Sequence, residues 1–270
     1  MKPQTKREYL RDLVAEKNRW SRPLTAKEKA LGFLGWHQRA YLPYCDFPGL
    51  VQFVTFRLAD SMQESRRGEW EHLLKVEDDR EKRTKLEEYL DRGVGECLLR
   101  DPRAGKVAED ALLHFHDARY ELLAWCVMPN HVHILVHVWQ TPLWKMVAMW
   151  KKFAAAKALA LLRSERRSPD RPVREDGNTV PNRSSPLHPF WQREYWDTFM
   201  RDEEQEKIAI RYIENNPVKA KLCAAKEQWP FSSAKFRDQF ARLVISTRTP
   251  ISQSASSQSF IEPIRRSAFR

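Results

Sequence analysis

The chain has 270 residues, which is enough for one large domain or two modest ones with a buried core. Lys and Arg outnumber Asp and Glu by 47 to 36, and the resulting net charge of +11 favours a polyanionic partner. The most apolar stretch, residues 122–139, is interrupted by Pro, Asn and His, so we expect no transmembrane helix and no membrane partner. Four scattered cysteines and the lack of an apolar leader lead us to expect a cytoplasmic protein.

The charge is distributed unevenly along the chain. Residues 1–30 hold nine Lys/Arg and four Asp/Glu, residues 60–101 hold thirteen acids and nine bases, and the last thirty residues return to a net charge of +4. We therefore predict a basic N-terminal arm over residues 1–46. The acidic segment is expected to point away from a polyanionic partner.

The first half of the chain contains one clear strand pattern followed by charged segments. GLVQFVTFRLAD, residues 49–60, alternates in the manner of a β-strand. Residues about 64–100 are charged with sparse apolar positions, which indicates a helical insert. A further helix is predicted over residues 104–116.

Two strands in close succession come next. Residues 119–128 and 131–139 are rich in β-branched and aromatic side chains and are separated only by Pro129 and Asn130. Pro fixes φ at the first turn position and Asn tolerates the second, so the pattern predicts an antiparallel hairpin. Residues 143–162 lack Gly and Pro and are rich in Ala, Leu, Lys and Met, which predicts a helix.

The last elements follow a segment rich in Arg, Ser and Pro. We predict a flexible loop over about residues 163–189, a strand over 191–200, a helix from Asp202 to about Asn216, and a disordered tail over 241–270. Pro217 is expected to stop the helix. The order strand, helix, two strands, helix, strand, helix is α+β and predicts an antiparallel sheet with helices on one face.

Two histidines share one face of the second hairpin strand. Because alternate residues of a strand point to the same side, His131 and His133 project together and form a candidate pair for a divalent metal ion. His137 lies on the same face, so a zinc site of three histidines is an alternative. Histidines that simply face solvent or satisfy local hydrogen bonds are the plainer interpretation of the same spacing.

A tyrosine and an asparagine lie one turn apart on the last predicted helix. Ile208, Tyr212 and Asn216 are spaced by four residues and so share one stripe. An aromatic residue on such a stripe is commonly part of the core. If the stripe lies over the histidines, the asparagine completes a metal site, and the tyrosine hydroxyl is placed to attack phosphorus.

The motifs around these residues resemble one family. AWCVMPNHVHILV is similar to the metal motif of single-tyrosine HUH endonucleases, and RYIENNPVKAKL followed by WPFSSA resembles the tyrosine helix of their REP-associated tyrosine transposase branch. GWHQRAYLPYCDFPGLVQFVTFRLADS and FWQREYWDTFMRDEEQ resemble two further segments of that branch, in the same order. The resemblance extends from about Gly35 to Ala234.

The resemblance implies a fold, a metal and a reaction. The fold is a ferredoxin-like antiparallel sheet, placed here over residues 47–240. Mg²⁺ or Mn²⁺ is held by His131, His133 and Asn216, and Tyr212 attacks a phosphodiester of single-stranded or hairpin DNA to leave a 5′-phosphotyrosine. We expect a nucleoid-associated monomer or homodimer. A hairpin-binding protein without catalysis and a zinc hydrolase built on the three histidines are the alternatives.

Basic residues near the motifs are candidates for contacts with DNA phosphates. They are Lys151, Lys152, Arg193, Arg201 and Lys219. For each of them, an ordinary solvated side chain is the alternative.

Overall fold

The computed structural model describes residues 22–39, 42–61, 85, 88–90, 92–166 and 189–245. The chain divides into two compact units, Met1–Lys235 and Phe236–Arg270. The main sheet, the helices that cover it and the candidate site lie in the first unit. Within the described part of the second unit, Arg237 and Leu243 form an isolated antiparallel bridge.

The main sheet has four strands in the order β4-β5-β3-β6, and every neighbouring pair is antiparallel. In the register of β3 and β5, Thr55 lies opposite His133 and Arg57 opposite His131. The strands are β3 (Leu50–Arg57), β4 (Tyr120–Val127), β5 (His131–Val138) and β6 (Trp196–Phe199).

The predicted hairpin is confirmed. The backbone N–H of Met128 donates to the carbonyl of His131 over 2.8 Å and closes the turn through Pro129 and Asn130. Seven of the eight residues of β5 are buried, on both faces of the strand. This pattern is typical of a central strand whose sheet is covered on both sides, rather than one face packed and one solvated.

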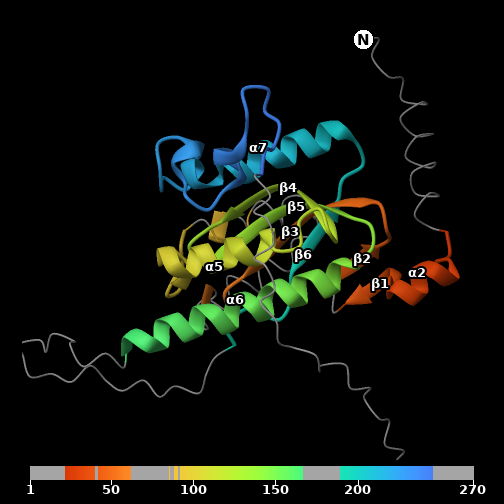
Figure 1. Cartoon of the computed structure of the whole chain (residues 1–270), viewed down its shortest axis with the longest axis horizontal. Coiled ribbons are helices and arrows are strands. Elements are labelled where there is room, and N and C mark those ends of the chain that lie inside the picture. The colour runs from red at the N-terminus through yellow and green to blue at the C-terminus, as the bar shows by residue number, and fades with distance from the viewer. Residues whose placement is uncertain are drawn as a thin grey trace, which may run out of the picture. The chain divides into compact units, whose positions relative to one another are not determined.

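Two helices cover one face of the sheet, α5 (Pro102–Leu113) and α6 (Leu143–Arg166), as Figure 1 shows. Asp101 caps α5 by accepting from the backbone of Arg103, with proline at the first helical position. The chain order β3-α5-β4-β5-α6-β6 with the sheet order β4-β5-β3-β6 is the ferredoxin-like arrangement. The α+β class, the antiparallel sheet and the placement of these helices on one face are therefore confirmed.

The opposite face of the sheet is covered by α7 (Glu203–Lys219) (Figure 1). Its residues Ala209 and Ile213 belong to the same buried cluster as Phe53, Cys126 and Leu135 of the sheet. Burial of this apolar face, more than helix propensity, holds such a helix in place. The histidine side of β5 is thus packed as well, by an element outside the ferredoxin-like core.

The expected end of α7 at Pro217 was wrong, because the helix continues through this proline to Lys219. Pro217 removes only the one intrahelical bond that its own nitrogen would have made. The next turn is completed by the backbone of Ala220, which donates to the carbonyl of Asn216 over 2.9 Å. The start of α7 agrees with expectation, since the Asp202 side chain accepts from the backbone of Gln205.

A short N-terminal helix and a two-stranded hairpin precede the sheet, within the range that the sequence assigns to the basic arm. Gln52 of β3 donates its side-chain amide to the carbonyl of Cys45 over 2.9 Å. These elements are α2 (Ala26–Leu31), β1 (Gly35–Arg39) and β2 (Leu42–Asp46), and the short 3₁₀ turns elsewhere are Ala59–Ser61, Leu98–Arg100, Lys226–Gln228 and Ser233–Phe236.

Several predicted segments fall mainly outside the described residues. They are the first part of the N-terminal arm, most of the insert over 64–100, most of the loop over 163–189, and most of the tail over 241–270. The predicted division into arm, catalytic domain and tail stays a prediction. Among the residues that the structure does describe, no helix is long and apolar enough to cross a bilayer.

Candidate metal and nucleophile site

The two predicted histidines lie side by side on β5. Their Nε2 atoms are 3.0 Å apart, and both side chains are almost completely buried. They face α7, together with Phe53 and Thr55 of the neighbouring strand. The interpretation as solvent-facing histidines is therefore excluded by their burial.

Asn130 fixes the tautomer of His131. Its amide nitrogen donates to the carbonyls of Leu90 and Val94, at 3.3 and 3.0 Å, so its oxygen is the atom turned toward His131. The Nδ1 of His131 lies 2.7 Å from that oxygen and must be the protonated nitrogen. The Nε2 of His131 consequently carries a lone pair, as a metal-binding histidine requires.

His133 is held in a similar way by Thr55, whose hydroxyl is 2.8 Å from Nδ1. Its ring also stacks on Phe53 with centroids 5.5 Å apart. Burial lowers the pKa of His133 to about 3, with a smaller contribution from the positive charge of Lys219. Burial and the neighbouring His133 hold the pKa of His131 well below its usual value. Both imidazoles are therefore neutral at pH 7.

Helix α7 brings the predicted tyrosine to the same site. The ring of Tyr212 packs edge-on against His133, with centroids 5.6 Å apart, and against Phe53 at 5.9 Å. Asn216, one turn further along the helix, donates its Nδ2 to the Tyr212 hydroxyl over 3.1 Å. Tyr212 is only partly buried, whereas His131, His133 and Asn216 are almost completely buried.

The residues one turn before and one turn after Asn216 indicate where this side chain lies. Tyr212 lies against His133, and Ala220, two turns later, lines the same cavity as His131. Asn216 lies between them, one turn from each along α7. Its side chain is 1% exposed, and its Oδ1 has no hydrogen-bond partner. A buried carbonyl oxygen without a partner is costly unless something else binds it.

These atoms form a plausible ligand set for a divalent ion. The two neutral imidazole nitrogens lie together, and two ligands at right angles with bonds of about 2.1 Å would lie about 3.0 Å apart. The observed separation of 3.0 Å between the two Nε2 atoms agrees with this. Two imidazole nitrogens and an amide oxygen are donors that a divalent metal ion accepts, and the assignment to Mg²⁺ or Mn²⁺ stays a prediction.

The alternative zinc site of three histidines is not assembled. His137 is four residues beyond His133 on the same strand, which places it about 13 Å away. Its Nδ1 instead lies 3.5 Å from a carboxylate oxygen of Glu121. In the described part of the chain, no three His, Cys, Asp or Glu side chains come together as a metal cluster.

The WPFSSA motif anchors the tyrosine helix to the sheet. Ser233 donates its hydroxyl to Glu214 of α7 over 2.8 Å and accepts the backbone N–H of Trp125 in β4. Lys226 reaches the other oxygen of Glu214 at 3.3 Å, although Glu214 is only 1% exposed. Trp229 donates to the carbonyl of Val127. The motif therefore fixes the height and rotation of α7 over the histidines.

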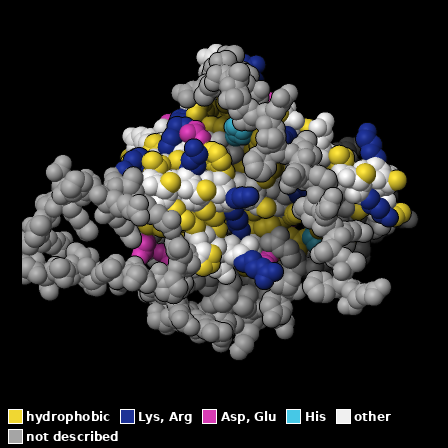
Figure 2. Space-filling view, turned by 60° about the horizontal axis from the view of Figure 1, so that its bottom comes forward, with side chains coloured by type: hydrophobic (Ala, Val, Ile, Leu, Met, Phe, Trp, Pro, Cys, Tyr) yellow, Lys and Arg dark blue, Asp and Glu magenta, His cyan; other side chains and the backbone are white. Residues whose placement is uncertain are grey.

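The candidate DNA contacts separate into different environments. Lys151 of α6 donates to the carbonyls of Gln192, Arg193 and Glu194 and so holds the segment before β6. Lys152 is exposed on α6, which covers the face opposite α7. Among the described residues on that side of the molecule, Figure 2 shows Lys and Arg in small separate groups.

Of the five basic residues predicted to contact DNA, Lys219 is the one that lies beside Tyr212. Its Nζ is 5.8 Å from the centroid of the Tyr212 ring. Arg193 and Arg201 are exposed near the start and the end of β6. Contact of these five basic residues with DNA stays a prediction.

Sequence reasoning missed three residues that support the histidines. Asn130 was assigned only to the turn, and Thr55 and Arg57 only to a strand. The buried Arg57 lies opposite His131 in the sheet and contributes to the low pKa of that histidine. Burial lowers the pKa of Arg57 itself to about 10. A polar residue on a central strand that otherwise reads as apolar was the signal available for Thr55 and Arg57.

Comparison with known proteins confirms the resemblance to REP-associated tyrosine transposases. A stretch of 114 residues, 42% of the chain, is 26% identical to a protein of Haemophilus influenzae curated as a candidate member of that group. The chain spans 58% of the length of this relative. No protein-family model matches the chain.

Two solved structures are also similar to the chain. One is a REP-associated tyrosine transposase bound to a REP hairpin, with 17% identity, a TM-score of 0.41, and coverage of 73% of this chain and 84% of the other. The second is a candidate transposase from Deinococcus radiodurans, with 16% identity, a TM-score of 0.26, and coverage of 67% and 96%.

Proposed function

We propose that the chain is a metal-dependent single-strand DNA endonuclease and strand transferase of the REP-associated tyrosine transposase type. It cleaves DNA at or near palindromic hairpins through Tyr212. The observation that carries the proposal is the packing of Tyr212, which is hydrogen-bonded to Asn216, against His133 of the buried histidine pair. The motif resemblance and the 26% identity to a candidate transposase support the same function.

The proposed reaction is a transesterification at phosphorus. The Tyr212 oxygen forms a bond to phosphorus as the bond from phosphorus to the 3′-oxygen breaks. The phenol proton is lost to solvent, and the departing oxygen takes up a proton to become a free 3′-hydroxyl. The number of phosphoester bonds is conserved, so the 3′-hydroxyl of another strand reverses the reaction without an external energy source.

Residues around the tyrosine stabilise the charge that develops on its oxygen. Asn216 already donates a hydrogen bond to the hydroxyl, and this bond strengthens as the oxygen loses its proton. The ammonium group of Lys219, which lies 5.8 Å from the ring centroid, favours the same negative charge. The partly exposed position of Tyr212 leaves room for a DNA strand to approach.

His131, His133 and the Oδ1 of Asn216 are the proposed metal ligands. A divalent ion held there would polarise a phosphate oxygen and neutralise part of its charge. Asn130 and Thr55 hold the two imidazoles through their Nδ1 atoms and would leave both Nε2 atoms to bind the ion. Asn216 would thus connect the two halves of the site, because its Oδ1 would bind the metal ion and its Nδ2 donates to the Tyr212 hydroxyl.

The direct test is covalent capture of DNA. Wild-type protein incubated with Mn²⁺ and an end-labelled hairpin oligonucleotide from the DNA flanking its gene should give a denaturation-resistant protein–DNA adduct. Tyr212→Phe should give none, while binding the same hairpin. An adduct with Tyr212→Phe would show that another residue is the nucleophile.

The same experiment separates the remaining alternative. Hairpin binding by the wild-type protein without cleavage under any divalent ion would support a non-catalytic DNA-binding protein. Loss of cleavage on chelation and its recovery with Mn²⁺ or Mg²⁺ would support the metal-dependent reaction.

A further inference from the structure

The turn before His131 is held by residues at both ends of the charged insert. The carbonyl of Pro129 accepts the backbone N–H of Leu99 over 3.1 Å, and the carbonyl of Asn130 accepts that of Leu58 over 2.8 Å. Leu58 precedes the insert, whereas Leu99 lies at its end. The described end of the acidic segment is therefore bonded to the hairpin that carries the histidine pair.

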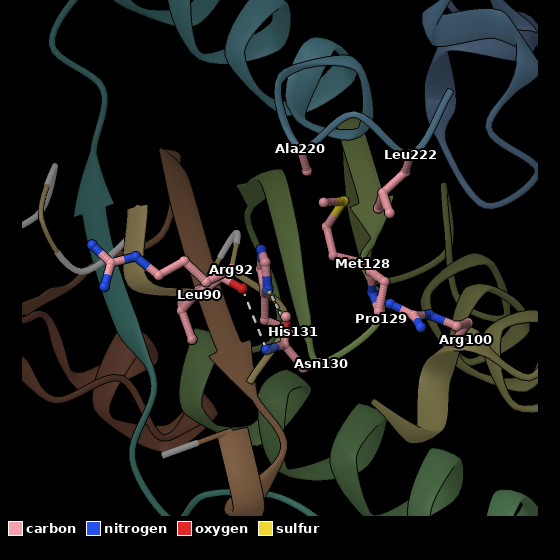
Figure 3. A pocket seen from close by; sticks show the side chains of 10 residues that line it. Leu90, Arg92, Arg100, Met128, Pro129, Asn130, His131, Ala220 and Leu222 are labelled. Carbon is pink, nitrogen blue, oxygen red and sulfur yellow. Dashed lines mark hydrogen bonds between the residues drawn. The ribbon is translucent and has the colours of Figure 1, made fainter. Parts of the chain in front are cut away.

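The direction of the Asn130 amide depends on carbonyl groups of the insert. Its nitrogen donates to Val94 over 3.0 Å and to Leu90 over 3.3 Å, and Figure 3 shows the bonds of Asn130 to Leu90 and His131. These two acceptors turn the amide oxygen toward His131. Without the nearer one, the amide would be free to turn its nitrogen toward Nδ1. The imidazole proton would then move to Nε2, the atom proposed to bind the metal ion.

The Val94 carbonyl is placed by the loop of residues 93–96, which packs against Asp60. The backbone N–H of Glu96 donates to the Asp60 Oδ2 over 2.6 Å. Gly95 has a φ of +99°, and a Cβ at this position would lie 2.7 Å from the carbonyl oxygen of Asp60. The two backbones thus approach as closely as only a glycine allows. One hydrogen bond and one close backbone contact fix the loop to Asp60.

Asp60 is itself held in place beside Asn130. It lies in the 3₁₀ turn Ala59–Ser61, which directly follows β3. The hydroxyl of Ser61 donates to the carbonyl of Leu58 over 2.8 Å, and the N–H of Leu58 donates to Asn130. Loss of the Asp60 carboxylate would therefore release the loop while the turn that carries it stays bonded.

We propose that Asp60 is a positioning residue for the metal ligand His131. It fixes the loop of residues 93–96, the loop presents the Val94 carbonyl to Asn130, and Asn130 keeps the proton of His131 on Nδ1. This inference rests on the proposed function, because it takes His131 as a metal ligand. The insert thereby supports the metal site, although none of its residues is a proposed ligand.

Two variants of Asp60 separate its hydrogen bond from its charge. Asp60→Ala and Asp60→Asn both remove the charge, but only alanine removes the acceptor for Glu96. Mn²⁺ binding to the full-length protein, measured by electron paramagnetic resonance, should weaken about tenfold in Asp60→Ala and stay close to wild type in Asp60→Asn. Equal weakening in both variants would overturn the proposal, because it would trace the effect to charge.

The imidazole nitrogens of the metal-free protein provide a readout that does not depend on metal. In ¹⁵N NMR spectra, wild-type His131 should be protonated at Nδ1 only, and Asp60→Ala should show partial protonation of Nε2. His133 is held by Thr55 and should keep its signals, so it serves as an internal control. Unchanged signals of His131, or equal changes at both histidines, would contradict the proposal.

Gly95→Ala reaches the same loop by a different route. The added Cβ meets the Asp60 carbonyl, so the loop must shift, and Mn²⁺ binding should weaken about as much as in Asp60→Ala. Gly49→Ala is the matched control, because its φ is +85° and nothing lies within 4 Å of the added Cβ. It should leave Mn²⁺ binding unchanged. Equal weakening by the two alanines would point to general destabilisation and against the loop.

The outcomes separate this inference from the proposed function. If the wild-type protein forms the Tyr212 adduct in Mn²⁺, but Asp60→Ala binds Mn²⁺ as tightly as wild type, the inference fails and the function stands. If the wild-type protein forms no adduct, but Asp60→Ala moves the proton of His131 and weakens Mn²⁺ binding, the proposed reaction fails and the role of Asp60 stands.

Discussion

Two clusters of buried polar residues on opposite faces of the sheet differ in how their hydrogen bonds are satisfied. On the face of α5 and α6, the buried Glu109 accepts from Trp125 and from Lys235, and Tyr120 links Trp150 to the carbonyl of Leu112. Each of these buried polar side chains is hydrogen-bonded to another group of the protein. On the face of α7, the two histidines meet at their Nε2 atoms, and the Oδ1 of Asn216 has no partner.

The difference indicates which of the two clusters is structural and which is functional. Satisfied buried hydrogen bonds stabilise a unique core, whereas a buried acceptor without a partner costs about 1–3 kcal/mol and persists where something else repays that cost. A bound metal ion on the α7 face would do so. The comparison predicts that substitutions on the α7 face change chemistry first, and that those on the α5 and α6 face change stability first.

The largest expected effect is the loss of a metal ligand. His131→Ala and His133→Ala should each lower the rate of hairpin cleavage at least about 100-fold, because each removes an imidazole that no neighbour replaces. Cleavage in saturating Mn²⁺ is the measurement, with hairpin binding as the check on folding. A variant that cleaves at the wild-type rate would remove that histidine from the site.

A smaller effect is expected from the residue behind His131. Asn130→Ala removes the acceptor that holds Nδ1, so the concentration of Mn²⁺ needed for half-maximal cleavage should rise about 10- to 100-fold. Saturating Mn²⁺ should restore most of the rate, since the ligands themselves are intact. If the cleavage rate falls while the Mn²⁺ concentration for half-maximal cleavage stays the same, Asn130 supports the conformation of the turn and does not orient His131.

Acid should destabilise the metal-free protein through the same histidines. Their folded pKa values lie below the ordinary value of 6.5, so the unfolded chain binds more protons as pH falls below about 6.5. The free energy of unfolding should therefore fall with pH, by up to about 1.4 kcal/mol per unit for each histidine, until the folded pKa is reached. Urea unfolding in EDTA at pH 7.5 and 5.5 measures this slope, and His133→Gln should make it shallower.

The smallest effect on chemistry is expected on the opposite face. Glu109→Gln weakens the contacts with Trp125 and Lys235 and should lower the free energy of unfolding by about 1–3 kcal/mol. The rate of cleavage per folded molecule should stay the same. A loss of cleavage comparable to that of the histidine variants would mean that the two faces do not separate as described.

The fold was largely predictable because its elements have local signatures. Alternating residues, the Pro129–Asn130 turn and the long Ala- and Leu-rich helix specify strands, a hairpin and α6 without long-range information. The exceptions involve tertiary packing. The helix α7 continues past Pro217 because its buried face and the WPFSSA anchor hold it there, and a local helix-stop rule cannot include that contribution.

The parts of the candidate site that could be predicted are those in which the spacing of residues along a strand or helix decides which face of that element they share. His131 and His133 share a side at strand spacing, and Tyr212 and Asn216 share a stripe at helix spacing. That these two faces meet depends on which side of the sheet α7 covers, which no local pattern contains. The same holds for Asn130 and Thr55, because their partners are distant in sequence.

The central claim is that Tyr212 attacks the phosphodiester held at the histidine pair. Wild-type protein is incubated with Mn²⁺ and a hairpin oligonucleotide labelled differently at its two ends, digested with protease, and the DNA-linked peptide is identified by mass spectrometry. We predict a peptide joined through Tyr212 to the fragment that lies 3′ of the cut, with a free 3′-hydroxyl on the other fragment. Linkage to a different residue, linkage to the fragment 5′ of the cut, or cleavage without any linked peptide would contradict the claim.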